Sequence, residues 1–211
     1  MSESPVSFTR RGVHPVGVAT LEVSLPESED RSVLTDVWYP SHTGDLDAAR
    51  AEHPFGRPHH AVPEVPPQDG PFPLVVFSHG NSGLRRQSTF LTTHLASWGL
   101  VVAAPDHSGN TFYEMSRIEG EEERRRIHFE ARRNRPRDLE AVAGRLLEGD
   151  SRWPRLTPER FGALGHSYGG WTALKMPGRD ARVGAVCGLA PASEPFVGRR
   201  AFEPDELPFA K

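Results

Sequence analysis

Cysteine is nearly absent from this sequence of 211 residues, in which Cys187 is the single one. A disulfide within the chain is therefore excluded, and we expect Cys187, which lies in an apolar run, to be a small buried residue. Long apolar runs are missing too, since none approaches the roughly 18 residues of a membrane-spanning helix. Residues 1–5 have neither the cationic region nor the apolar core of a signal peptide. These absences predict a cytoplasmic protein with no membrane partner.

An excess of charge of one sign is lacking as well. Lys and Arg together number 25, Asp and Glu number 28, and the formal net charge is −3. A nucleic-acid partner would call for a basic excess, so none is expected. A chain of this length with 36% hydrophobic residues is expected to fold as a single domain, residues 1–211, around one core.

Histidines gather in residues 40–73, a segment rich in Pro and Gly that shows no regular period and is interpreted as a loop. They are His42, His53, His59 and His60. Their spacing matches no compact metal site, so we interpret them as solvated loop residues and expect no bound metal.

Short apolar runs alternate with helical patterns along the chain. We predict strands at residues 16–23, 33–39, 74–77, 100–104, 161–164 and 183–189. Between the third and fourth runs, apolar and aromatic residues recur at helical intervals, as Phe90, Leu91, His94, Leu95 and Trp98. A strand, a helix and a strand in this order form a parallel unit. The sequence therefore predicts an α/β fold with an open, mostly parallel, doubly wound sheet and helices on both faces.

Two further helices are predicted before the fifth strand. Residues 117–133 carry acidic residues early and basic residues late, which suits an exposed helix. A second helix is expected to begin at Arg135–Asp138 and to bury a stripe that includes Leu139 and Val142. We interpret residues 107–133 as a lid or insertion within the domain.

The stretch Gly-His-Ser-Tyr-Gly at residues 165–169 follows an apolar strand and precedes a helical pattern. This is the context of a nucleophile elbow, in which a tight turn exposes a serine hydroxyl at the end of a sheet. Ser167 is therefore the candidate nucleophile. A non-catalytic Gly-rich turn is the alternative interpretation of the same pattern.

Attack on an ester carbonyl creates an oxyanion, which needs donors already aimed at it. One expected donor is the backbone N–H of Tyr168, directly after the nucleophile. The other is the backbone N–H of Asn81, in the loop that follows the strand at residues 74–77.

The base and the acid of a triad are harder to find. None of the residues after Ser167 is histidine, whereas the elbow pattern calls for an acid and then a histidine later in the chain. His166 is interpreted as a packing or hydrogen-bonding residue and not as the base. His79 and His107 are expected at the rim of the site, and Asp106 and Asp138 are interpreted as turn and helix-cap carboxylates.

Several segments in the same order resemble the α/β-hydrolase superfamily, and more narrowly bacterial predicted dienelactone hydrolases and platelet-activating-factor acetylhydrolase-like serine esterases. They include residues 73–80, 95–107, 135–138 and the elbow, and together they cover most of residues 13–191. The resemblance implies an acyl-enzyme on Ser167, an oxyanion hole at Asn81 and Tyr168, a small-molecule carboxylic ester as substrate and no cofactor. True dienelactone hydrolases use a cysteine nucleophile, so a serine at position 167 argues against dienelactone as the substrate.

The same resemblance places the triad Asp and His beyond Lys211, together with the last strands of the sheet. We therefore expect an incomplete domain whose strand at residues 183–189 forms an exposed edge, a known aggregation hazard. Two alternatives stay open, namely a non-catalytic α/β-hydrolase-like binding module and an inactive truncated remnant. The sequence does not fix the oligomeric state.

Overall fold

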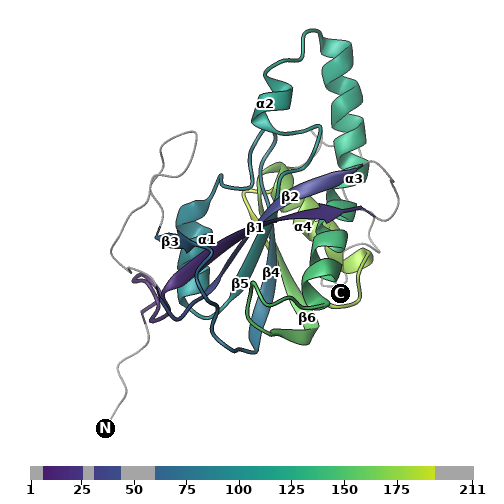
Figure 1. The fold of residues 1–211 in the computed structure, drawn as a ribbon. Coiled ribbons are helices and arrows are strands. Elements are labelled where there is room, and N and C mark those ends of the chain that lie inside the picture. The colour runs from purple at the N-terminus through teal and green to yellow at the C-terminus, as the bar shows by residue number, and fades with distance from the viewer. Residues whose placement is uncertain (1–6, 26–30, 44–59, 193–211) are drawn as a thin grey trace.

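The computed structural model describes residues 7–25, 31–43 and 60–192. Seven strands form one sheet in the order β3-β1-β2-β5-β4-β6-β7 (Figure 1). The strands are β1 (Val16–Ser24), β2 (Ser32–Pro40), β3 (Ala61–Pro63), β4 (Phe72–Ser78), β5 (Val101–Pro105), β6 (Leu156–His166) and β7 (Val183–Leu189). The helices are α1 (Thr89–Ser97), α2 (Phe112–Met115), α3 (Glu121–Leu147) and α4 (Tyr168–Lys175), followed by the short 3₁₀ helix η1 (Met176–Gly178).

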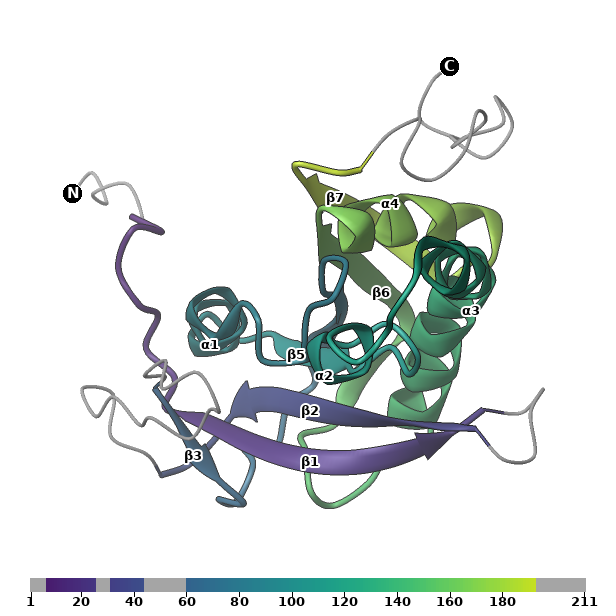
Figure 2. The same cartoon turned by 90° about the horizontal axis from the view of Figure 1, so that it is seen from above.

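The strands from β4 onward pair in parallel, as the alternating pattern predicted. The N-terminal strands β1 and β2 pair antiparallel, and β2 joins the parallel part by pairing antiparallel with β5. Apolar side chains fill both faces of the sheet. One cluster includes Val76 and Leu139 of α3, and the other includes Phe77 and Ala96 of α1. Figure 2 accordingly shows α1 and the pair α3–α4 on opposite sides of β5 and β6. The expected doubly wound α/β sheet is confirmed.

Residues 121–147 form one continuous helix, α3, where the sequence pattern predicted two. Pro136 lies inside it and removes one backbone hydrogen bond. The helix nevertheless continues, because Arg135, Pro136 and Leu139 are all buried against the rest of the domain and tertiary packing outweighs the local cost. The first half of α3 and the short α2 extend together beyond the ends of the strands (Figure 1).

The predicted apolar residues of α1 are only partly confirmed as its buried face, since Leu91 and Leu95 pack against the core but are themselves only partly buried. Small residues face the sheet, namely Thr89, Thr92, Thr93, Ala96 and Ser97, whereas Phe90 is 71% exposed. The threonine hydroxyls remain satisfied when buried, since Thr93 Oγ1 donates to the Thr89 carbonyl at 2.6 Å. Short side chains let this helix approach the sheet closely, which the periodicity of the large apolar residues could not indicate.

Two further expectations are corrected. The segment predicted as loop contains the short strand β3, which pairs in parallel with β1. Cys187, expected to be buried, is exposed. It lies on β7, the last strand of the sheet, and within the described part of the chain no strand covers the outer edge of β7. That edge is the one that the sequence predicted to be open.

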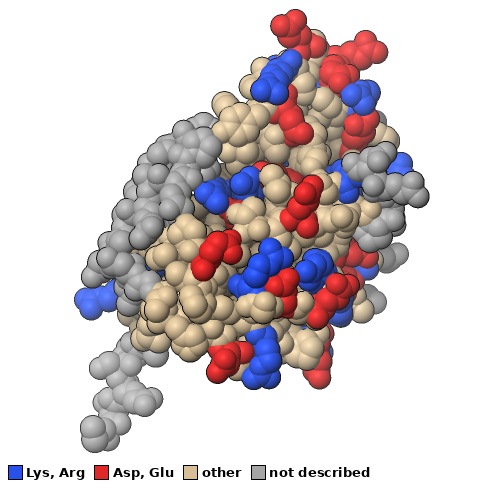
Figure 3. Space-filling view, viewed as in Figure 1, with Lys and Arg blue, Asp and Glu red and all other residues tan. Residues whose placement is uncertain are grey.

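Charges of both signs are interspersed over the face shown in Figure 3, as the balanced composition predicted. Within residues 7–25, 31–43 and 60–192 no helix is long and apolar enough to cross a membrane. In those ranges no group of His, Cys, Asp and Glu is arranged to hold a metal ion. Two of the loop histidines considered for such a site, His53 and His59, lie outside the described residues.

Candidate active site at the junction of β6 and α4

Ser167 alone forms the turn between β6, which ends at His166, and α4, which begins at Tyr168. Its backbone has φ 53° and ψ −118°, a conformation that non-glycine residues rarely adopt and that costs on the order of 1–3 kcal/mol. Backbone hydrogen bonds hold the turn: the Ser167 N–H donates to the Leu189 carbonyl at 2.9 Å, and the Ser167 carbonyl accepts from the Ala192 N–H at 2.8 Å. The elbow is thus fixed by the end of β7, and its serine is partly exposed.

Two glycines of the elbow are required by close backbone contacts. A Cβ at Gly165 would lie 2.0 Å from the Gly169 carbonyl oxygen, and a Cβ at Gly169 would lie 1.9 Å from the Ser78 carbonyl oxygen. Neither backbone oxygen can turn aside as a flexible side chain would. The contact at Gly169 brings the first turn of α4 against the end of β4, and so places the elbow beside the loop that contains Asn81.

Gln87 links this loop to the elbow. Its Oε1 accepts from the Gly80 N–H at 2.8 Å, and its Nε2 lies 3.0 Å from His166 Nδ1. His166 is therefore a hydrogen-bonding residue, as expected, and its Nδ1 accepts from an amide. In the part of the chain that the structure describes, no group accepts a hydrogen bond from the Asn81 N–H. Gln87 was not predicted as a site residue, because nothing in the sequence indicates which polar side chain bonds both to the Asn81 loop and to the elbow.

A cavity of about 610 Å³ opens beside this loop. It is lined by Asn81, Ser82, Gly83, Leu84, Arg86, Gln87, Ser88, Phe90, Phe112 and His166. Residues that follow β4 therefore share one cavity with His166 of the elbow, whereas Ser167 is not among its lining residues. The cavity lies at the carboxyl ends of the parallel strands, where ligands bind in open α/β sheets.

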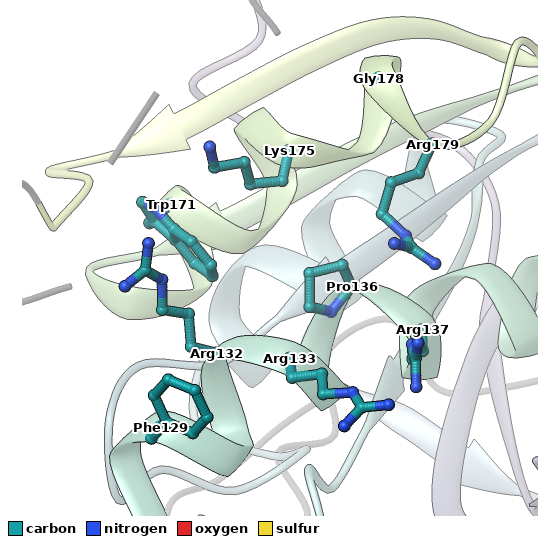
Figure 4. A pocket seen from close by; sticks show the side chains of 9 residues that line it. All are labelled: Phe129, Arg132, Arg133, Pro136, Arg137, Trp171, Lys175, Gly178 and Arg179. Atoms are coloured by element: carbon teal, nitrogen blue, oxygen red, sulfur yellow. The ribbon is translucent and has the colours of Figure 1, made fainter. Parts of the chain in front are cut away.

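A second cavity, of about 500 Å³, lies between α3 and α4 (Figure 4). Five of its side chains are cationic and none is acidic, the cations being Arg132, Arg133, Arg137, Lys175 and Arg179. Arg179 pairs with Glu140 at 2.7 Å and Lys175 lies over the Trp171 ring. Ser167 lines neither cavity, but this second one also lacks every other residue of the elbow and of the Asn81 loop, so we do not assign the reacting part of a substrate to it.

Below the elbow, three side chains form a hydrogen-bonded chain that the sequence analysis did not predict. Ser78 Oγ lies 2.8 Å from His107 Nε2, and His107 Nδ1 lies 2.8 Å from Asp138 Oδ2. All three residues are fully buried, so Ser78 cannot reach a substrate despite this serine-histidine-aspartate order. The expectation that His107 lies at the rim of the site is wrong, and Asp138 is no cap, because it lies inside α3.

Burial also governs the protonation of this cluster. Burial raises the pKa of Asp138 to about 7, and Arg31 and Arg135 oppose the rise. The pKa of His107 is held well below 6.5 by burial and by the positive charge of Arg135. His107 is therefore neutral at physiological pH.

His79, expected at the rim, is also fully buried. Its Nε2 accepts from the His107 N–H at 3.1 Å, so the proton must reside on Nδ1, which donates to the Gly80 carbonyl at 2.7 Å. Burial and Arg135 lower the pKa of His79 well below 6.5. Asp106 does stabilise a turn, as expected, because its carboxylate accepts from the Arg85 N–H at 2.6 Å.

No histidine ring in the described part of the chain forms a hydrogen bond with Ser167 Oγ. The structure thus brings the elbow and the Asn81 loop together. Within residues 7–25, 31–43 and 60–192, however, no histidine is placed to act as a base for Ser167.

The family model for platelet-activating factor acetylhydrolase, isoform II, matches residues 57–143. A putative phospholipase A2 of Schizosaccharomyces pombe is 29% identical over 47% of this chain and 32% of its own length. A platelet-activating factor acetylhydrolase of Cavia porcellus is 26% identical over 56% of this chain and 34% of its own length. The chain therefore spans about a third of the length of the curated relatives that it matches.

Solved structures agree on the fold. A ferulic acid esterase from Streptomyces cinnamoneus superposes with a TM-score of 0.63 at 29% identity, over 82% of this chain and 60% of that one. A putative dienelactone hydrolase from Klebsiella pneumoniae gives a TM-score of 0.55 at 16% identity, over 83% of this chain and 60% of that one. Taken with the sheet topology, these likenesses show that the chain has the α/β-hydrolase fold and is similar to acetylhydrolases and to esterases of that fold.

Proposed function

We propose that this chain carries the nucleophile of a carboxylic ester hydrolase and forms an acyl-enzyme on Ser167. The observation that supports this most is the strained backbone of Ser167, the only residue between β6 and α4, with φ 53°. A strained residue at such a turn is retained where the surroundings enforce it, and nucleophiles are a frequent reason. The similarity to acetylhydrolases and to a ferulic acid esterase supports an ester as the substrate.

In the proposed reaction, Ser167 Oγ attacks the ester carbonyl carbon while a base takes the hydroxyl proton. The tetrahedral oxyanion is stabilised by the backbone N–H groups of Asn81 and Tyr168, each worth about 2.7–4 kcal/mol by analogy with other hydrolases. Collapse of the intermediate releases the alcohol, which receives the proton, and leaves the acyl group on Ser167. Water then attacks the acyl-enzyme, releasing the carboxylic acid and restoring the serine.

The base in this scheme is a histidine oriented by an aspartate, and we assign both to positions beyond Lys211, in agreement with the order serine, acid, histidine. His107 and Asp138 do not serve, because they are buried and bonded to each other and to Ser78. Short-chain esters are the proposed substrates, by analogy with the acetylhydrolase relative. No cofactor takes part.

Covalent labelling with a fluorophosphonate, combined with hydrolysis of p-nitrophenyl acetate, tests the proposal. We expect labelling at Ser167 by peptide mass spectrometry, its loss in Ser167→Ala and its retention in Ser151→Ala, a substitution in an exposed turn. Because no described histidine contacts Ser167, we expect this chain alone to react orders of magnitude more slowly than an enzyme with a base at its nucleophile, so labelling should be followed over hours.

The alternative functions give different results. Saturable binding of an ester analogue without labelling of Ser167 would indicate a non-catalytic binding module. Neither binding nor labelling in a folded protein would indicate an inactive remnant.

A further inference from the structure

We propose that Arg135 is a positioning residue of the oxyanion hole: its buried guanidinium fixes the peptide that joins Gly80 to Asn81 and, at the same time, the first turn of α4. The inference rests on the proposed function, because the Asn81 and Tyr168 N–H groups are assigned there as the oxyanion donors. Arg135 was not among the residues that the sequence pointed to, since it lies in a segment interpreted as a helix start.

Arg135 is fully buried in the middle of α3. Burying a charge costs several kcal/mol unless it is paired, and an ion pair with a carboxylate is the usual compensation. Among the residues that the structure describes, no carboxylate lies within 4 Å of this guanidinium, and its Nε and Nη1 have no hydrogen-bond partner. Burial lowers the pKa of Arg135 to about 10, so the group is still charged at neutral pH. An arginine held here at such a cost is poorly explained by stability alone.

The hydrogen bonds that Arg135 does make go to the Asn81 loop. Its Nη2 donates to the His79 carbonyl by a short contact and lies 3.3 Å from the Gly80 carbonyl oxygen. His79 Nδ1 donates to that same Gly80 oxygen at 2.7 Å. Two donors thus converge on one backbone carbonyl directly before Asn81.

The Gly80 carbonyl and the Asn81 N–H belong to the same planar peptide and point in opposite directions. Holding the carbonyl on the side of Arg135 therefore fixes the direction in which the Asn81 N–H points. A positive charge at the carbonyl end also polarises the peptide, which makes its N–H a stronger donor to an oxyanion. The Asn81 N–H, which has no acceptor among the described residues, is thereby held ready for one.

The same guanidinium contacts the elbow. Its Cζ lies 4.6 Å from the centroid of the Tyr168 ring, over which it stacks as a cation–π pair. The Tyr168 hydroxyl in turn donates at 3.2 Å to the carbonyl of His128, which precedes Arg135 on α3. One buried side chain therefore contacts both segments that carry the proposed oxyanion donors, and α3 is the element that holds it there.

The test compares Arg135→Lys with Arg133→Lys, a matched substitution at an exposed position two residues earlier on α3. A lysine keeps the charge and the stem but has no planar fork that could reach the two carbonyls while lying over the Tyr168 ring. Two readouts are measured on folded protein: the ¹H–¹⁵N resonance and hydrogen exchange of the Asn81 amide, and the rate of fluorophosphonate labelling at saturating reagent.

We expect Arg135→Lys to shift the Asn81 amide resonance and speed its exchange, and to lower the maximal labelling rate about 10- to 100-fold, with little change in reagent affinity. This loss is smaller than the 10²–10³-fold loss that follows outright removal of a donor. Arg133→Lys should change neither readout. A purely structural role would instead lower the melting temperature and leave the Asn81 amide and the labelling rate of the folded fraction unchanged, which would overturn the inference.

The amide readout separates this inference from the proposed function. If wild-type protein is not labelled, the proposed function fails, and an Asn81 amide that still depends on Arg135 supports the positioning role. If Arg135→Lys does not fold, the test uses the wild-type protein. Slow exchange of the Arg135 η protons, together with a scalar coupling across the hydrogen bond to the His79 or Gly80 carbonyl carbon, supports the contact. Fast exchange of these protons and no such coupling overturns the inference.

Discussion

Beneath the partly exposed Ser167, the side chains of Ser78, His107 and Asp138 repeat the order of a serine-hydrolase triad where no substrate can reach them. Ser78 thus has a histidine and an aspartate as partners but is buried, whereas Ser167 is partly exposed but has no such partners among the described residues. The sequence indicated Ser167 from the local pattern of glycines, but the buried chain joins three residues that are far apart in the sequence, so no local signal could reveal it. His107 and Asp138 were considered individually, and their pairing appeared only when β5 and α3 came together.

Asp138 makes the stability of the fold depend on pH. Its pKa is about 7 in the folded protein, against 3.8 for an exposed aspartate, so between these pH values the folded state holds a proton that the unfolded state has lost. Its contribution to the free energy of unfolding therefore falls as the pH rises from about 4 to about 7, by at most about 1.4 kcal/mol per pH unit. Urea unfolding of wild type and Asp138→Asn across this range measures the effect.

We expect the difference in unfolding free energy, wild type minus Asp138→Asn, to decline steadily with rising pH in that window. His79 and His107 have lowered pKa values and destabilise the fold as the pH falls below their unfolded pKa. The contribution of His79, which does not contact Asp138, cancels in the difference, whereas that of His107, which is hydrogen-bonded to Asp138, does not cancel fully. A difference that is constant with pH would contradict the protonation proposed for Asp138.

At the scale of elements, the elbow depends on backbone contacts between β4, β6 and α4. Most strands and the helices α1 and α4 were predictable, because apolar periodicity and Gly-rich turns are local features, whereas the short elements β3 and α2 were not. Which face of α1 is buried was not predictable, since threonines rather than Phe90 meet the sheet. The continuity of α3 through Pro136 was likewise decided by packing and not by propensity.

The contact between α4 and β4 leads to a second prediction. A Cβ at Gly169 would overlap the backbone carbonyl of Ser78 at 1.9 Å, so Gly169→Ala should destabilise the protein by about 3 kcal/mol or more. Gly144→Ala is the matched control, since a Cβ there has no atom within 4 Å and alanine favours the helix by about 0.5–1 kcal/mol. Chemical denaturation of both variants gives the two values, and a Gly169→Ala variant as stable as wild type would refute the close approach.

For the molecule as a whole, we expect the outer edge of β7, on which no strand of residues 7–25, 31–43 and 60–192 lies, to affect its behaviour in solution. Gly184, Ala185 and Cys187 are exposed there. An apolar hollow of about 300 Å³ adjoins this strand and α1, lined by Val75, Leu91, Leu95, Gly162, Ala163, Leu164, Ala185, Val186, Cys187 and Leu189. An unpaired, apolar edge is a template for strand pairing with another chain.

We therefore expect this chain to associate with itself as its concentration rises, and Ala185→Lys to suppress the association because a lysine on an edge strand opposes pairing. Ala181→Lys is the control, since it adds the same charge in the exposed turn before β7. Size-exclusion chromatography with light scattering, under reducing conditions that keep Cys187 from forming disulfides, measures the mass. A monomer at every concentration would count against an open edge.

The sequence by itself determined the α/β alternation, the mostly parallel sheet and the position of the Ser167 turn, because strand and helix periods and a glycine-flanked serine turn are properties of neighbouring residues. Only the tertiary structure decided what surrounds that serine. Close packing of α4 on β4 sets the elbow beside the Asn81 loop, and the burial of Arg135, His79, His107 and Asp138 beneath it follows from contacts between β4, β5 and α3. Such contacts join residues distant in sequence, and burial, which sets their charge and their partners, exists only once those elements have packed.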